Sequence, residues 1–308
     1  MTIVALRALG VGDFLTAVPA LRALARAFPH DHRILAAPAE LTPLVRLARC
    51  VDEIVDAAPL EDLPAKLADA EMAVNLHGSG PQSHGLLLRL RPRRLIAFAH
   101  DAVPQTRESP RWHPFEHEVQ RWCRLLRESG IPADANEVDI DLPAHVCAQH
   151  DAVVVHPGAA SESRRWPAER WIELCIALRR QGYPVLLTGS RSEFRRARTI
   201  AKAASLPLSR VLAGRTQLGD LAAIVGGARA VICGDTGIAH LATALHKPSV
   251  LLFGPTSPHA WGPPADRSLH RIIWRGTLGD PHAATTDPGL ASITVNEVLT
   301  ELKGTIAA

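Results

Sequence analysis

The sequence predicts an α/β protein of two consecutive βα domains, each with a parallel sheet, and three observations lead to this class. Short runs rich in Val, Ile, Leu and Ala recur between longer segments of helical periodicity. These runs do not alternate with polar residues, as expected for parallel strands that are covered on both faces. The chain has 308 residues, of which 47% are hydrophobic, so it can bury a large core and its length favours two domains over one.

In the first half, five apolar runs are predicted to be strands, and most are separated by a segment long enough for a helix. They are Thr2 to Arg7, Arg33 to Ala37, Glu53 to Asp56, Met72 to Leu76 and Arg94 to Phe98. The first strand leads through a glycine-rich turn into an apolar-periodic helix from Leu15 to Phe28. The segment from Ile131 to His150 contains two prolines and several Asp, which is typical of a linker. We therefore place the first domain at residues 1–150.

The second half, residues 151–308, has the same organisation. Its predicted strands are Ala152 to Val155, Pro184 to Thr188, Arg210 to Leu212, Ala230 to Cys233 and Ser249 to Phe253. The last periodic stretch, Val295 to Leu302, predicts a terminal helix, and a loop with Pro281, Pro288 and Gly289 separates it from the strands.

The amino-acid composition limits which classes of molecule the protein is expected to bind. The 34 basic and 31 acidic side chains give a net charge of +3, which is too balanced for a typical nucleic-acid-binding protein but leaves anionic small molecules as partners. The five cysteines are widely spaced without a CxxC pair, so we expect neither a disulfide framework nor a zinc site, and a reducing cytoplasm fits best. No stretch approaches the roughly 20 apolar residues of a membrane span, so membrane contact is expected to be peripheral at most.

Glycine-rich loops follow the predicted strands of the second half. In open parallel sheets, ligands bind beyond the carboxyl ends of the strands. Glycine lets the backbone approach a ligand closely, and hydroxyl and N–H groups at a helix start bind phosphate oxygens. The loops are His156 to Ala159, Gly189-Ser190, Gly214 to Thr216, Gly234 to Gly237 and Gly254 to Thr256.

The segment from Gly234 to His240 is the sharpest of these loops, because a predicted strand runs straight into it and a predicted helix runs straight out. That arrangement directs backbone amides at an anion. The alternative is that Asp235 or Thr236 is only a helix N-cap and Gly237 a tight turn. Five such loops on one side of one sheet favour the phosphate-binding interpretation.

Asp13 lies in a second glycine-rich turn, between the first strand and the first helix. The turn contains Gly10 and Gly12, but position 15 is Leu where a dinucleotide fingerprint needs a third glycine, which argues against an oxidoreductase. Asp13 is therefore either a helix N-cap or a carboxylate that acts as a general base on a hydroxyl.

Two adjacent arginines, Arg164 and Arg165, follow the first strand of the second domain. Near phosphate-binding loops they can neutralise a departing diphosphate, and the alternative is a solvated basic loop. Asp139 and Asp141 have the carboxylate spacing of metal-dependent sugar transferases but lie in the linker beside Pro143, which favours a solvated turn. The histidines are scattered, so no metal is assigned.

Five segments distributed along most of the chain carry a family resemblance. They are Gly12 to Leu21, Val74 to Gly78, Trp166-Pro167 with Trp171, Asp235 to Ala242 and Phe253 to Pro258. In this order they resemble the opening motif, the acceptor-side loop, the basic-Trp-Pro motif and the two C-terminal signatures of glycosyltransferase family 9, the ADP-heptose:lipopolysaccharide heptosyltransferases and their relatives. The resemblance implies the GT-B architecture: an acceptor-side Rossmann-like domain, residues 1–150, faces a donor domain, residues 151–308, across a cleft.

The resemblance also implies roles for single residues. Asp13 would be the catalytic base, and Arg164 the cation that stabilises the donor diphosphate. The family usually has lysine there, and arginine keeps the charge but presents a wider fork. Glu193 looks like the acidic residue that contacts the donor nucleoside. The other assigned residues are Gly158, Asp235, Thr236, Gly237 and His240 on the donor side and Gly12, His77 and Gly78 on the acceptor side.

The resulting hypothesis is an inverting, metal-independent transfer of a heptose or related sugar from a nucleotide-diphosphate donor, ADP-heptose, to a hydroxyl of a glycolipid or small-molecule sugar acceptor. No cofactor is expected, because the nucleotide-sugar is a substrate. Two alternatives stay open: a GT-B transferase that uses a different nucleotide hexose, and a noncatalytic nucleotide-sugar binding protein. Fold analogy does not separate them, because function depends on sites grafted onto folds.

Overall fold

The computed structural model describes residues 1–144 and 151–307, and the chain divides into two compact units. Unit 1 is Met1–Ile140 and unit 2 is Asp141–Ala308. The boundary predicted near residue 150 falls at the segment 145–150, which lies outside the described residues. The division between Ile140 and Asp141 lies within the segment predicted to be a linker.

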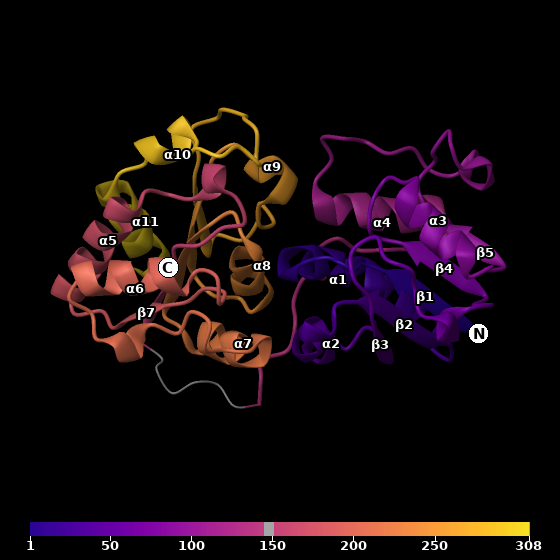
Figure 1. Ribbon diagram of the computed structural model, residues 1–308, viewed down its shortest axis with the longest axis horizontal. Coiled ribbons are helices and arrows are strands. Elements are labelled where there is room, and N and C mark those ends of the chain that lie inside the picture. The colour runs from indigo at the N-terminus through magenta and orange to yellow at the C-terminus, as the bar shows by residue number, and fades with distance from the viewer. Residues whose placement is uncertain (145–150, 308) are drawn as a thin grey trace. The chain divides into compact units, whose positions relative to one another are not determined.

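The described residues of unit 1 form a five-stranded parallel sheet with the strand order β3-β2-β1-β4-β5 (Figure 1). The strands predicted in the first half of the chain are thereby confirmed. The strands and α-helices are β1 (Thr2–Leu6), α1 (Val11–Ala27), β2 (His32–Ala37), α2 (Thr42–Ala48), β3 (Glu53–Asp56), β4 (Met72–Asn75), α3 (Gln82–Arg89), β5 (Arg94–Ile96) and α4 (Glu118–Glu128).

Side chains of β1 alternate between the two faces of this sheet. Val4 and Leu6 belong to a buried cluster that includes Leu86 and Leu87 of α3. Right-handed crossovers place α1 and α3 on opposite faces, because the chain moves one way from β1 to β2 and the other way from β4 to β5. Helices α1 and α4 pack against each other. Cover on both faces explains why the strands have uninterrupted apolar sequences.

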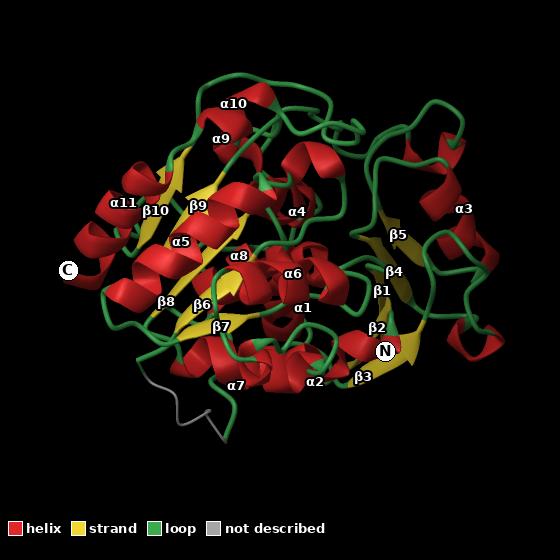
Figure 2. Ribbon diagram, turned by 60° about the vertical axis from the view of Figure 1, so that its left-hand side comes forward, coloured by secondary structure: helices red, strands yellow, loops and turns green. Residues whose placement is uncertain are grey.

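The described residues of unit 2 form a second five-stranded parallel sheet, with the order β10-β9-β8-β6-β7. Helices α5, α6 and α11 contribute to the core on one of its faces (Figure 2). The strands and α-helices are β6 (Val153–His156), α5 (Ala168–Arg180), β7 (Val185–Leu187), α6 (Phe194–Ala203), α7 (Leu218–Gly227), β8 (Ala230–Gly234), α8 (Gly237–Ala244), β9 (Ser249–Leu252), α9 (Pro258–Trp261), β10 (His270–Ile273), α10 (Pro288–Ser292) and α11 (Val295–Ala307).

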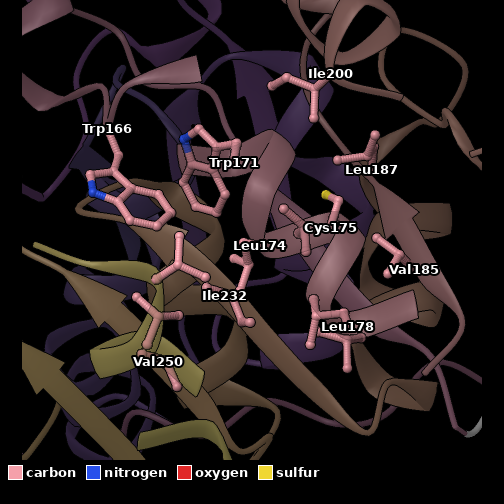
Figure 3. Close-up of a cluster of buried hydrophobic side chains, with 14 of the residues drawn as sticks. Trp166, Trp171, Leu174, Cys175, Leu178, Val185, Leu187, Ile200, Ile232 and Val250 are labelled. Carbon is pink, nitrogen blue, oxygen red and sulfur yellow. The ribbon is translucent and has the colours of Figure 1, made fainter. Parts of the chain in front are cut away.

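Two tryptophans anchor the core of unit 2 (Figure 3). Trp166 and Trp171 are each 1% exposed, and their rings meet edge to face with 4.9 Å between centroids. The indole Nε1 of Trp166 donates a hydrogen bond of 3.0 Å to the carbonyl of Ile293, so the polar atom of this buried ring is satisfied. The chain just before α5 is therefore fixed to the core.

One predicted strand of unit 2 is wrong, and one observed strand was not predicted. The predicted strand from Arg210 to Leu212 is instead a 3-10 turn, Leu208–Arg210, followed by a single bridge between Val211 and Leu187. Pro207 and Gly214 confine this apolar stretch to a length that makes one bridge and no ladder. The prediction also missed β10, an edge strand with the short polar-apolar sequence HRII.

No helix among the described residues is long and apolar enough to cross a membrane.

Candidate functional site

The turn after β1 carries Asp13 at the carboxyl edge of the unit 1 sheet. Asp13 lies in the first turn of α1, whose N-cap is Gly10, so the N-cap interpretation of Asp13 is wrong. Gly12 lies beside it in the same helical turn. The Asp13 side chain keeps 30% of its surface exposed, so the hydroxyl of a ligand can reach its carboxylate.

Arg7 directly follows β1, and its guanidinium contacts residues of α1, of α4 and of the loop after β4. Its Nε donates to the Asp13 carbonyl at 2.9 Å, and its Nη2 lies 3.3 Å from the Asp13 carboxylate. The same Nη2 donates to Glu118 of α4 at 2.9 Å, while Nη1 donates to the carbonyl of Leu76 after β4. Arg7 is 1% exposed, so its positive charge is compensated almost entirely by protein groups and not by water.

The environment of Asp13 alters its proton affinity. Burial raises the pKa of Asp13 above its ordinary value, the positive charge of Arg7 opposes this rise, and the negative charge of Glu118 adds to it. A carboxylate with a raised pKa is a stronger base than an ordinary one.

His77 and Gly78 lie in the loop after β4, which is the sheet neighbour of β1. The amide of His77 donates to Asn75 Oδ1 at 2.9 Å, and the buried Asn75 side chain in turn donates to Ser83. Burial, together with the charge of Arg7, lowers the pKa of His77 to about 4. His77 is therefore neutral at pH 7.

In unit 2, β6 lies between β7 and β8, so the loops after these strands meet at one edge of the sheet. Glu193, the residue before α6, accepts hydrogen bonds from the amide and hydroxyl of Ser190 at 2.7 and 2.8 Å. A Cβ on Gly158 would lie 1.9 Å from Glu193 Oε1. Position 158 therefore has to be glycine for the Glu193 carboxylate to lie over the β6 loop. Burial lowers the pKa of the neighbouring His156, and the charge of Glu193 opposes that shift.

Arg164 and Asp235 lie at the same edge. Arg164 Nη1 is 3.9 Å from Asp235 Oδ2, and the Asp235 residue is 6% exposed. Burial raises the pKa of Asp235, while Arg164 and a hydrogen bond with Thr256 lower it. A Cβ on Gly234 would lie 3.2 Å from the Arg164 carbonyl, so the end of β8 permits this close approach.

A distant loop holds the 3-10 turn that bears Arg164. The hydroxyl of Ser161 donates to the carbonyl of Pro281, and the amide of Ser163 donates to Ala283 at 3.2 Å. The amide of Asp287 returns a hydrogen bond to the Ser163 carbonyl at 3.2 Å. Trp166 fixes the other end of the turn in the core. The position of Arg164 is thus set from both sides.

The segment after β8 begins α8. Thr236 occupies its N-cap position, as the N-cap interpretation predicted, but its side chain makes no capping hydrogen bond. Gly237 opens the helix, and the first-turn amides of a helix are favourable to an anion. His240, one turn on, meets Trp261 edge to face with 6.0 Å between ring centroids.

Three residues that support these sites were not found from the sequence: Arg7, Glu118 and Ser161. Arg7 did carry a signal, because a charge at the end of a buried apolar strand needs a partner. Glu118 and Ser161 are separated from their partners, Arg7 and Pro281, by 111 and 120 residues, and no local sequence pattern indicates such pairings.

Among the described residues, no group of three or more His, Cys, Asp or Glu side chains is arranged to hold a metal ion.

The fold and these two edges define a class of protein: a two-domain α/β protein whose second domain has glycine-rich loops at the carboxyl edge of a parallel sheet, where ligands bind in such folds. The chain belongs to glycosyltransferase family 9 (heptosyltransferase), which matches residues 97–281, more than half of its length. A similar curated protein is lipooligosaccharide heptosyltransferase 2 of Haemophilus influenzae, 31% identical over 219 residues, 66% of this chain. The match spans 60% of that relative's length.

Solved structures share the fold across the whole chain. The structure of E. coli ADP-heptose LPS heptosyltransferase II matches with a TM-score of 0.83 at 22% identity, covering 100% of this chain and 99% of that one. An E. coli heptosyltransferase solved with ADP matches with a TM-score of 0.73 at 19% identity, covering 99% and 100%. The GT-B fold class predicted from the sequence is confirmed.

Proposed function

We propose that this chain is an inverting, metal-independent glycosyltransferase that moves heptose from ADP-heptose to a hydroxyl of a lipopolysaccharide-type glycolipid acceptor. The observation that carries the proposal is the edge of unit 2, where Arg164 lies 3.9 Å from Asp235 and Glu193 lies over Gly158. Family membership and the names of the similar proteins, which are heptosyltransferases, support the same reaction.

Unit 2 would hold the donor. The guanidinium of Arg164 and the first amides of α8 neutralise the diphosphate, on which negative charge grows as it leaves. Glu193 accepts hydrogen bonds from the nucleoside, and Asp235, Thr236, Gly237 and His240 line the pyrophosphate and sugar. Gly158 keeps the β6 loop open to the Glu193 carboxylate.

Unit 1 would supply the base and the acceptor contacts, with Gly12, His77 and Gly78 beside Asp13. The acceptor oxygen attacks the anomeric carbon of the donor sugar, and Asp13 takes the proton from that oxygen. The bond from the anomeric carbon to the diphosphate oxygen breaks, the nucleoside diphosphate leaves with the electron pair, and the anomeric configuration inverts. The raised pKa of Asp13 suits this step.

We also propose a cytoplasmic reaction with at most peripheral membrane contact. The buried free thiols of Cys50, Cys123, Cys175 and Cys233 support a reducing compartment.

A panel of donors tests the proposal. We expect ADP-heptose to raise the unfolding temperature more than GDP-, UDP- or dTDP-sugars, because a ligand at about a hundred times its Kd stabilises by about 2.7 kcal/mol. Each donor is then incubated with a heptose-deficient lipopolysaccharide core, and transfer is followed by mass spectrometry. Preference for another nucleotide would overturn the donor assignment, and binding without transfer to any acceptor would support a noncatalytic role.

A further inference from the structure

A buried group of charges lies behind Asp13, and it includes a carboxylate from a distant helix. Glu118 at the start of α4 is 4% exposed. Its Oε1 accepts hydrogen bonds from Arg7 Nη2 at 2.9 Å and from Trp122 Nε1 at 3.0 Å, and its Oε2 pairs with Arg121. The Arg7 guanidinium also lies over the Trp122 ring, 4.8 Å from its centroid. Glu118 is thus held by Arg7, Arg121 and Trp122, and Trp122 also contacts Arg7.

The guanidinium of Arg7 connects Glu118 to Asp13. The same nitrogen, Nη2, lies 2.9 Å from Glu118 and 3.3 Å from the Asp13 carboxylate, so the two carboxylates share one cation. Thr16 supports the arrangement: its hydroxyl donates to the Asp13 carbonyl at 2.9 Å and lies 3.3 Å from Arg7 Nη2. A planar fork with fixed donors leaves little freedom for the Asp13 side chain.

We propose that Glu118, acting through Arg7, is a positioning residue that fixes the orientation of the Asp13 carboxylate and limits how tightly Arg7 pairs with it. The inference rests on the proposed role of Asp13 as the base. A base paired fully with an arginine would be a poor proton acceptor, because the ion pair favours its charged form. By holding the closer, 2.9 Å contact with Arg7, Glu118 leaves Asp13 with the longer one and keeps it basic.

The charged and titratable groups around Asp13 come from three elements. Arg7 follows β1, Glu118 and Arg121 belong to α4, and His77 lies in the loop after β4. Loss of the Glu118 charge lowers the pKa of Asp13, and loss of the Arg7 charge raises it, because the first opposes and the second favours the Asp13 anion. His77 stays neutral above about pH 4 and adds no charge.

The test is the pH dependence of kcat in Glu118→Gln and Arg7→Met, with Glu116→Gln as the matched control. Glu118→Gln keeps the hydrogen-bonding shape of the side chain and removes its charge, so the acidic limb of the kcat–pH profile is expected to move down by about one pH unit. Arg7→Met moves it up. Glu116 pairs with Arg124 outside this group, so its amide variant leaves the limb in place. A purely structural role for Glu118 would lower kcat without moving the limb.

A second measurement does not need activity. Carbon-13 NMR of aspartate-labelled protein, with Asp13 assigned from Asp13→Asn, follows the same carboxylate in wild type, Glu118→Gln and Arg7→Lys. A lower Asp13 pKa in Glu118→Gln, together with an Asp13 pKa close to the wild-type value in Arg7→Lys, supports the inference. An unchanged Asp13 titration in folded Glu118→Gln overturns it while the proposed function stands. Normal turnover by Asp13→Asn instead overturns the proposed base and this inference with it.

Discussion

Arg164 and Arg165 are adjacent in sequence but differ in what they contact. Arg165 uses its guanidinium within unit 2, with Glu162 at 2.8 Å and the Ala159 carbonyl at 2.9 Å. Arg164 makes a longer contact to the Asp235 carboxylate, 3.9 Å away. From the sequence, the two arginines are equivalent candidates for the diphosphate, and only the family resemblance favours Arg164. We therefore propose Arg164 for the diphosphate, because its contacts, 3.3 Å to the Ser161 hydroxyl and 3.9 Å to Asp235, are longer than those of Arg165.

We expect Arg164→Ala to raise the Kd for ADP by about tenfold to a hundredfold, because hydrogen bonds to charged groups contribute about 1.5–3 kcal/mol. Arg164→Lys keeps the charge and recovers most of the affinity. Isothermal titration calorimetry measures these values, and Arg165→Ala is the matched control, expected to change Kd by less than about threefold. Equal losses in the two alanine variants would contradict the assignment of the diphosphate to Arg164.

Residues that carry the proposed chemistry were predictable where they lie in a contiguous motif. Asp13 stands out because a glycine-rich turn links a strand to a helix there, and Asp235 for the same reason after β8. The residues that hold them were not predictable. Glu118 reaches Arg7 across 111 residues, and this pairing exists only once α4 packs beside α1.

Among the structural elements, the loop after β6 packs against the start of α6, and Gly158 makes their close approach possible. The Gly158 position leaves no room for a side chain, since a Cβ there would lie 1.9 Å from Glu193 Oε1. The Glu193 carboxylate is the flexible end of a side chain, so a substitution displaces it while the two elements keep their places.

We therefore expect Gly158→Ala to fold normally and to raise the Kd for ADP by about tenfold or more, since Glu193 loses its position over the loop. Fluorescence titration with ADP and circular dichroism check both parts. The control is Gly304→Ala in α11, where nothing other than the adjacent residues and the helix's own backbone lies within 4 Å of the added Cβ. This control should leave Kd unchanged and stabilise the helix by up to about 1 kcal/mol. Unchanged ADP binding in Gly158→Ala would contradict the assignment of Glu193 to the nucleoside.

Strands were predictable from the sequence where both faces are covered. The central strands β1, β4, β6 and β8 are uninterrupted apolar runs, and all were predicted. The edge strand β10 was missed because its short sequence, HRII, mixes polar and apolar residues, whereas the edge strands β3, β5 and β7 were predicted. The stretch around Val211 was wrongly predicted to be a strand. Val211 is fully buried, as in a strand, but it forms only a single bridge, because burial alone does not produce a ladder of hydrogen bonds.

At the scale of the whole molecule, buried histidines link stability to pH. His270 is 7% exposed, its Nδ1 contacts the Ser249 hydroxyl at 2.8 Å, and its buried Nε2 has no hydrogen-bond partner within the described chain. Burial lowers the pKa of His270 from 6.5 to about 4. The unfolded chain therefore binds a proton that the folded chain does not between these two values. The contribution to stability is full above pH 6.5 and is lost as the pH falls towards 4.

We expect the free energy of unfolding to fall by about 2 kcal/mol from pH 7 to pH 5 on account of His270 alone. Urea denaturation at the two pH values, compared with His270→Leu, isolates this contribution because the variant removes the titrating group and leaves the other histidines in place. Parallel pH dependence in the two proteins would show that His270 is not responsible.

In the proposed reaction, unit 2 binds the nucleotide and Asp13 of unit 1 is the base. The most direct measurement is the turnover of ADP-heptose with a lipopolysaccharide core acceptor by Asp13→Asn, together with the Kd for ADP of the same variant. We predict that kcat falls by more than about a hundredfold, the loss expected for a general base, while the Kd for ADP is unchanged. Near-normal turnover by Asp13→Asn would contradict the account.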